Sequence, residues 1–134
     1  MPAGQWLLQL GGLILQKMKV TRIYTGDDMQ SHFEGIEVEI GPSPQGHGSL
    51  SERFPASGVI FRETDGDYDL DFHVAPRRQY VVNLDGSVEI TVGSGETRVI
   101  GPGEVFLAED TTGQGHISRA VDGQVRHSLW ITLD

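Results

Sequence analysis

Residues 66–92 read GDYDLDFHVAPRRQYVVNLDGSVEITV. Apolar and polar side chains alternate over residues 67–74 and again over 88–92, with the period of two that is typical of strands. Between them, the Asp85-Gly86 dipeptide suits a two-residue hairpin turn, because both turn positions require a positive φ. This stretch therefore predicts short antiparallel strands joined by tight turns.

The same pattern continues in both directions along the chain. Alternation or short apolar runs occur at residues 36–40, 59–62, 80–84, 105–108, 117–121 and 125–133. Asp122-Gly123 is a second hairpin dipeptide, and Gly93-Ser-Gly95 and Gly101-Pro-Gly103 mark two further turns. No stretch has ten residues of helical periodicity. Strands this short, with turns this frequent, predict an all-β sandwich or barrel.

Composition limits both the size and the partners of this fold. The 134 residues suit one domain, and there is no cysteine, which excludes disulfides and thiol chemistry and fits a reducing, cytoplasmic compartment. The formal charge of −9 removes the electrostatic basis for binding nucleic acid or an anionic membrane. We therefore expect a small molecule or another protein as the partner.

Residues 1–17 differ from the rest, because they are apolar and carry only one charge, on Lys17. The segment lacks the basic start of a secretory signal and is too short to span a bilayer. It is interpreted as an extension upstream of a start at Met18, as an added strand at a sheet edge, or as an arm contacting a second subunit. Residues 18–134 are expected to form the single domain.

The order of residues from Gly66 to His116 resembles the two motifs of the cupin superfamily. Gly66, His73, Gln79 and Gly86 follow the order of the first motif, with six residues between Gln79 and Gly86. Pro102-Gly103, the strand at 104–108 and His116 follow the layout of the second motif. The resemblance implies a double-stranded β-helix, or jelly-roll barrel, around a pocket for a small ligand.

In the cupin superfamily, a full metal site has three histidines and one glutamate. By the motif spacing, Ala75 stands where the second histidine belongs, and Gln79 replaces the glutamate. The resemblance thus leaves His73, Gln79 and His116 as ligands for a weakly held divalent metal such as Fe, Mn, Ni or Zn. A neutral amide oxygen binds such ions less well than a carboxylate.

Catalytic roles fall, on this resemblance, to His73, His116 and Arg77. His73 shares strand parity with Asp69 and Asp71, so it points either into the pocket, with one of them as partner, or into water. Arg77 either binds a substrate anion through its guanidinium fork or, with Arg78, braces the barrel rim through Glu109 or Asp110.

Four further residues are candidates for binding the substrate: Gln79, Tyr80, His127 and Trp130. His127 lies within the apolar set Val125, Leu129 and Ile131. It is therefore interpreted either as a hydrogen-bonded core histidine or as part of the pocket wall. Tyr80 and Trp130 are interpreted either as packing residues or as an aromatic wall for the ligand.

Two classes of function remain open. The first is an enzyme of the isomerase, lyase or oxygenase class acting on a small polar molecule, with or without a metal. The second is a binding module without catalysis, a degenerate cupin that keeps the barrel. Because exposed strand edges are usually covered, a homodimer is expected, with residues 36–40 or the N-terminal arm adding to the partner's sheet.

Overall fold

The computed structural model describes residues 5–10 and 13–134, with side chains from Gln16 onward. Every regular element in this part of the chain is a strand, which confirms the all-β prediction. The described residues include no helix with the length and apolar character that crossing a membrane requires.

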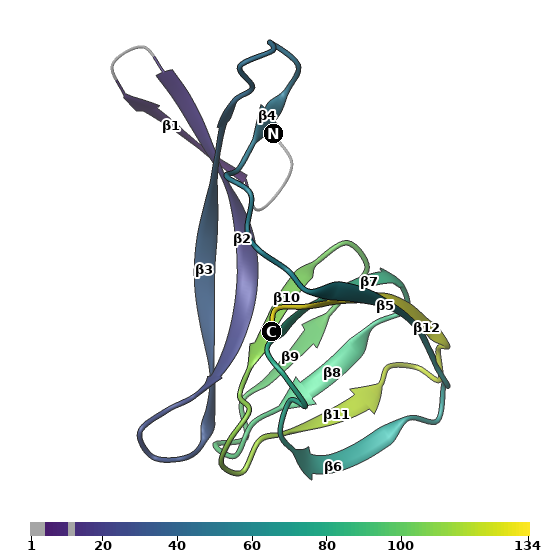
Figure 1. Cartoon of the computed structure of the whole chain (residues 1–134). Coiled ribbons are helices and arrows are strands. Elements are labelled where there is room, and N and C mark those ends of the chain that lie inside the picture. Colours follow the sequence, from purple (N-terminus) through teal and green to yellow (C-terminus); the bar gives the residue numbers. More distant parts are fainter. Residues whose placement is uncertain (1–4, 11–12) are drawn as a thin grey trace.

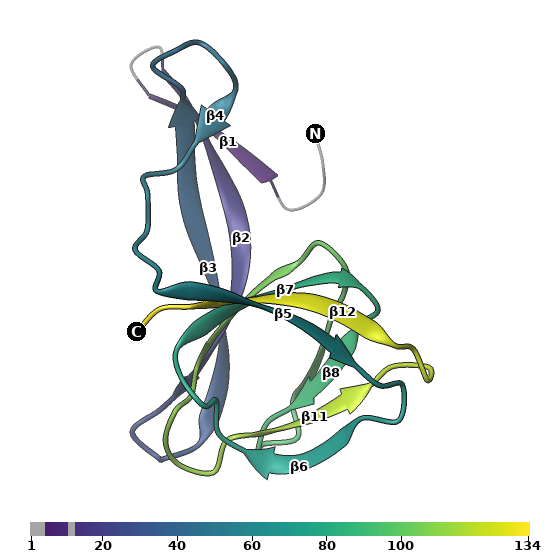
Figure 2. The same cartoon turned by 45° about the vertical axis from the view of Figure 1, so that its right-hand side comes forward.

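Eight strands form the barrel shown in Figure 1. They are β5 (Gly58–Thr64), β6 (Asp69–His73), β7 (Gln79–Asp85), β8 (Val88–Thr91), β9 (Thr97–Ile100), β10 (Val105–Glu109), β11 (His116–Ala120) and β12 (Arg126–Thr132). One sheet has the order β5-β12-β7-β10 and the other the order β6-β11-β8-β9. Figure 2 shows the two sheets curled around a shared interior.

The strand order identifies the architecture. The first barrel strand, β5, pairs with the eighth, β12, and the second, β6, pairs with the seventh, β11. The third pairs with the sixth and the fourth with the fifth, so a long hairpin is folded over into two sheets. This is the strand order of a jelly roll, which confirms the predicted fold.

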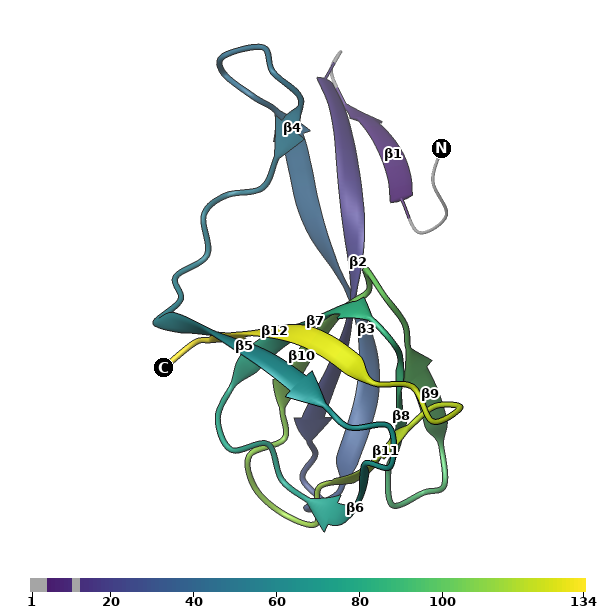
Figure 3. The same cartoon turned by 90° about the vertical axis from the view of Figure 1, so that its right-hand side faces the viewer.

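A long hairpin extends the first sheet beyond the barrel. It consists of β2 (Leu13–Thr25) and β3 (Ser31–Pro42), with β1 (Gln5–Leu10) and β4 (Ser49–Leu50) at its edges. The half of β2 from Val20 to Tyr24 pairs in parallel with β10 and completes the barrel wall. The other half of the hairpin projects away from the barrel (Figure 3).

The expected boundary between residues 17 and 18 falls inside β2, which runs through it without interruption. Upstream of it, β1 pairs antiparallel with β2. Residues 1–4 and 11–12 lie outside the described residues, and the division into an N-terminal segment and a barrel domain stays a prediction.

The core lies between the two sheets of the barrel. Its buried apolar residues come from strands of both sheets and from the connections that follow β6 and β8: Ile23, Ala75, Val81, Val88, Ile90, Val92, Ile100, Phe106 and Ala108. On the outer face of the first sheet, Phe61 of the edge strand β5 is 78% exposed. Exposed apolar side chains on an edge strand are typical of surfaces that are covered by a partner. The homodimer itself stays a prediction.

We expect Gly115→Ala to destabilise the protein. Gly115 has a φ of +80°, and a Cβ at this position would overlap the backbone carbonyl of His73. The left-handed backbone alone costs a non-glycine residue about 1–3 kcal/mol, and the overlap adds to that. Urea denaturation measures the loss. Gly35→Ala is the control, because Gly35 lies in a strand with open space at its Cβ. Equal stability of the two variants would contradict the expectation.

Candidate functional site

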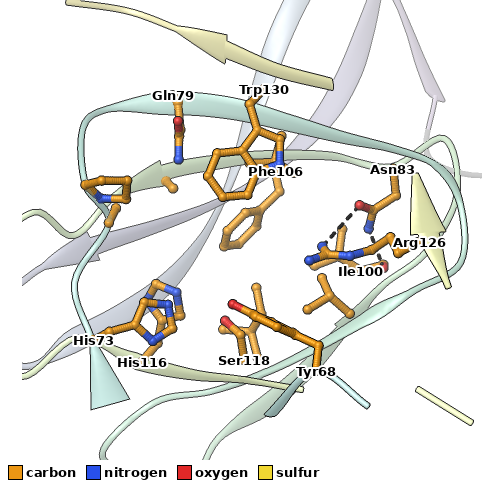
Figure 4. Close-up of a pocket in the computed structure, with 16 residues that line it drawn as sticks. Tyr68, His73, Gln79, Asn83, Ile100, Phe106, His116, Ser118, Arg126 and Trp130 are labelled. Carbon is orange, nitrogen blue, oxygen red and sulfur yellow. Dashed lines mark hydrogen bonds between the residues drawn. The ribbon is translucent and has the colours of Figure 1, made fainter. Parts of the chain in front are cut away.

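A cavity lies between the two sheets, near the middle of the barrel. Its volume is about 60 Å³ when measured as the space open to the centre of a water molecule. That is room for several waters or one small organic molecule. The polar lining residues labelled in Figure 4 are Tyr68, His73, Gln79, Asn83, His116, Ser118 and Arg126, and the rest of the lining is apolar except for Trp130.

Two imidazoles meet at one end of this cavity, as the motif spacing predicts. His73 of β6 and His116 of β11 are direct cross-strand partners, and their ring centroids lie 4.5 Å apart. The pairing shifts register between His116 and Ser118, so that Ser118 is paired with Leu70. This bulge explains why His73 joins the cavity although simple alternation groups it with Asp69 and Asp71.

His116 is held by a buried carboxylate. Its Nδ1 lies 2.6 Å from Oδ2 of Asp110, a residue with no exposed surface. The same oxygen accepts a hydrogen bond from the hydroxyl of Ser31 at 2.7 Å. A carboxylate only accepts, so Nδ1 of His116 carries a proton, and in the neutral imidazole Nε2 keeps its lone pair.

His73 is oriented by backbone rather than by a carboxylate. Its Nδ1 donates to the carbonyl oxygen of Asp71 at 2.8 Å, which again leaves the Nε2 lone pair free. Burial lowers the pKa of His73 below its usual value, and the neighbouring His116 lowers it further. His73 is therefore neutral at pH 7. The Asp69 carboxylate, the other partner considered from the sequence, pairs instead with Arg119.

Gln79 is buried in the cavity wall, and a hydrogen bond from Arg77 orients its side-chain amide. Arg77 Nη1 donates to Oε1 of Gln79 at 3.1 Å. Because the amide oxygen is taken by the guanidinium, the NH₂ group of Gln79 faces the cavity (Figure 4). Arg77 is half-buried and is not among the lining residues, so it positions Gln79 rather than facing a ligand.

The donors at this end of the cavity do not fit the predicted metal site. A divalent metal needs lone pairs, and Gln79 presents N–H groups instead. That leaves only the two imidazole Nε2 atoms. The described residues contain no group of three or more histidine, cysteine, aspartate or glutamate side chains able to hold a metal.

A second polar group lies at the opposite end of the cavity (Figure 4). Arg126 Nη1 donates to Oδ1 of Asn83 at 3.3 Å, and Nδ2 of Asn83 donates to the backbone carbonyl of Ile100 at 3.0 Å. The Tyr68 ring lies 5.9 Å from the Arg126 guanidinium carbon. The sequence patterns do not identify Tyr68, Asn83 or Arg126 as candidate site residues, although Arg126 alternates with Ser128 and Trp130.

Two of the residues expected to bind substrate lie elsewhere. His127 is outside both the core and the cavity wall, so both interpretations of it are wrong. Its ring is exposed and bridges Asp85 at 2.9 Å and Glu63 at 2.8 Å. The reason is that the alternate residues Arg126 and Ser128 are buried on the inner face of β12, which turns His127 outward.

Tyr80 is half-buried on β7 but is not among the lining residues, which are its neighbours Gln79 and Val81. Trp130 does line the cavity, and its indole donates to the Ser128 hydroxyl at 3.1 Å. Its part in ligand binding stays a prediction. Arg78 pairs with Glu109 at 2.6 Å, which is the bracing contact considered for it from the sequence.

No protein-family model matches the chain, and no curated protein matches it. Among solved structures, the chain is similar to one from Salmonella typhimurium LT2 described as a candidate ethanolamine utilization protein Q. The match has 15% sequence identity and a TM-score of 0.38, and it covers 87% of this chain and 96% of the other. A TM-score this low does not support a fold assignment, so the assignment of a jelly roll is based on the strand order alone.

We expect the imidazole pKa values of His73 and His127 to be shifted in opposite directions from the usual value. Hydrogen bonds that the His127 ring donates to Asp85 and Glu63 raise the pKa of His127 above its usual value of 6.5, whereas burial lowers the pKa of His73 below it. NMR of the imidazole C–H signals against pH measures both midpoints, and Asp85→Asn should lower that of His127. A midpoint for His73 at or above that of His127 would contradict this expectation.

Proposed function

We propose that the protein is an enzyme that moves protons on a small polar molecule bound inside the barrel. The observation that carries this proposal is the pair formed by His116 and the buried Asp110, with the Nε2 lone pair of His116 free at a cavity wall. A histidine oriented by a carboxylate is the usual arrangement for a general base.

The proposed reaction begins when Nε2 of His116 removes a proton from a carbon next to a carbonyl group. The C–H electron pair forms the carbon–carbon double bond of an enolate, and the carbonyl π pair moves to the oxygen, which becomes negatively charged. The Asp110 carboxylate stabilises the imidazolium that forms. A second acid on the opposite face of the enolate then gives a proton to the same carbon, which inverts its configuration and completes an isomerisation. The acid regains its proton, and His116 loses its own, by exchange with water.

Other residues of the same cavity support this chemistry. The NH₂ group of Gln79, fixed by Arg77, is a donor for the developing oxyanion. His73 is neutral and stands beside His116, so it can accept a hydrogen bond from a substrate hydroxyl. The Tyr68 hydroxyl points into the cavity and is a second group able to carry a proton (Figure 4). The resemblance to cupins points the same way, since their epimerase branch uses a histidine–carboxylate pair and a tyrosine.

The alternative is a binding module without catalysis. One observation favours it: Ala75 lies buried in the cavity wall, where the motif spacing expects a histidine. Both proposals use the same cavity, and they differ in whether a bound molecule changes chemically.

We expect His116→Asn to lower the rate of proton transfer by about 10²–10⁴-fold, the usual contribution of a positioned acid or base. The measurement is wash-in of deuterium from D₂O at carbons next to the carbonyl of short-chain oxo acids, aldehydes and amides, followed by NMR. Asp110→Asn should lower the rate in the same direction, because Asn presents no charge to the imidazolium.

His32→Asn is the matched control, since His32 lies on β3 outside the cavity lining and its ring binds Asp28. Its rate should equal that of the unchanged protein. Binding of a compound without any exchange or conversion across the panel would support the binding module and overturn the enzyme.

We also expect activity to survive removal of metals. Because Gln79 offers N–H donors and only two imidazoles remain, Fe, Mn, Ni or Zn should bind weakly if at all. The exchange rate is measured after dialysis against a chelator and again after each metal is added back. A rate that falls on chelation and returns with one metal would show that the site uses that metal.

A further inference from the structure

Arg126 is a buried cation in the cavity wall without a carboxylate partner. The residue is only 6% exposed, at the start of β12, and it is one of the lining residues. By contrast, the described arginines that form ion pairs have exposed or half-buried side chains, for example Arg119, which pairs with Asp69. Within residues 16–134, where side chains are described, no carboxylate lies within 4 Å of the Arg126 guanidinium.

The surroundings of Arg126 hold its charge in place but do not neutralise it. Its hydrogen-bond partner is the neutral Asn83, whose amide is itself fixed by the Ile100 carbonyl. Burial lowers the pKa of Arg126 from its usual high value, and nearby Arg62 adds to this effect. A guanidinium stays protonated in proteins, so the cavity contains a real positive charge at this end.

A buried charge without a counter-charge is costly to the folded protein. The Asp85-Gly86 turn packs directly on Arg126, where a Cβ at Gly86 would lie 3.0 Å from its Cα. The connection between β7 and β8 thus covers the backbone of Arg126, and the whole residue is buried from bulk water. One of its five N–H donors is used by Asn83, and the others are available to a ligand in the cavity.

We propose that this cavity binds a small monocarboxylate, with the carboxylate on Arg126. A single guanidinium supplies one positive charge and a planar fork of donors, which matches one carboxylate group. Apolar walls from Val88, Ile90 and Phe106 suit a short hydrocarbon chain, and the small volume excludes a nucleotide or a large sugar.

The orientation of the substrate follows from this assignment and rests on the proposed function. With the carboxylate at the Arg126 end, the other end of the molecule lies at His73 and His116 (Figure 4). The substrate class is therefore a short-chain carboxylate that bears a carbonyl or hydroxyl group away from its acid group. Binding of the carboxylate itself does not depend on catalysis.

The test compares butanoate with its neutral amide, butyramide, by isothermal titration calorimetry and thermal unfolding of the full chain. Butanoate should bind and raise the unfolding temperature, and butyramide should bind at least about tenfold more weakly, which corresponds to about 1.4 kcal/mol. Inorganic phosphate is the third probe. Equal binding of the amide, or stronger binding of phosphate, overturns the carboxylate assignment.

Arg126→Gln should weaken butanoate binding by about 10–100-fold, because a charge-assisted, bidentate contact is lost. Without ligand this variant should be as stable as the unchanged protein or more stable, since an unpaired buried charge is removed. Arg119→Gln, which removes an exposed arginine of β11, is the matched control and should bind butanoate normally. Unchanged binding by Arg126→Gln overturns the proposal, and the amide comparison decides it if that variant does not fold.

His116→Asn separates this proposal from the proposed function. If both hold, the variant keeps butanoate binding and loses deuterium exchange. Exchange by the unchanged protein without selective butanoate binding overturns the carboxylate site alone. Selective binding without exchange by any compound overturns the enzyme alone.

Discussion

The buried carboxylate of Asp110 joins the parts of the chain on which the site depends. It directly follows β10, and its Oδ2 accepts hydrogen bonds from Ser31 at the start of β3 and from His116 at the start of β11. Its backbone carbonyl accepts from the amide of Ala75, in the connection between β6 and β7. One residue thus links both barrel sheets and the long hairpin.

This linkage fixes His116 more firmly than packing alone would. A carboxylate with no exposed surface needs its donors, because losing one leaves a buried charge without compensation. The Asp110 Oδ1 atom already lacks a partner among the described residues. His116 therefore cannot turn away from Oδ2 without a large cost, and its Nε2 atom stays directed away from the carboxylate. Gly115 completes the arrangement, since only a glycine lets the chain pass so close to the His73 carbonyl.

The strands and turns were predictable from the sequence because they depend on local interactions. A period of two and an Asp-Gly pair act over a few residues, and the glycine of each Asp-Gly pair lies in a turn with a positive φ. The prediction that these turns close hairpins is wrong, because β7 and β8, like β11 and β12, are consecutive strands of different sheets. The meeting of His73 with His116 followed from the motif spacing, which reflects the order of strands in a jelly roll. These features need no knowledge of side-chain packing.

The inner face of each strand was not predictable in the same way. Along β12 the apolar set Leu129 and Ile131 suggests the core, yet Arg126 and Ser128 are the residues buried inside. Alternation defines two faces but does not say which one is enclosed, and a barrel that holds a ligand encloses polar groups. For the same reason the arginine in the cavity wall is Arg126, which no motif marks, and not Arg77.

The polar residues inside the barrel are better explained by ligand binding than by a contribution to the stability of the fold. Five buried polar or charged residues line the cavity, namely Gln79, Asn83, His116, Ser118 and Arg126. Apolar residues of similar size would fill the same space without the cost of desolvating them. Most of their partners are within the wall, as with Asn83 and the Ile100 carbonyl.

The hydrogen-bonding groups of the wall that have no partner lie at the two ends of the cavity. In the neutral imidazoles of His73 and His116, the Nε2 lone pairs have no hydrogen-bond donor among the described residues. The guanidinium of Arg126 likewise keeps donors without an acceptor there. Acceptors at one end and a cation at the other cannot satisfy each other across the cavity. A molecule with a carboxylate at one end and a proton to donate at the other would satisfy both, and the short-chain carboxylate that we propose has these two groups.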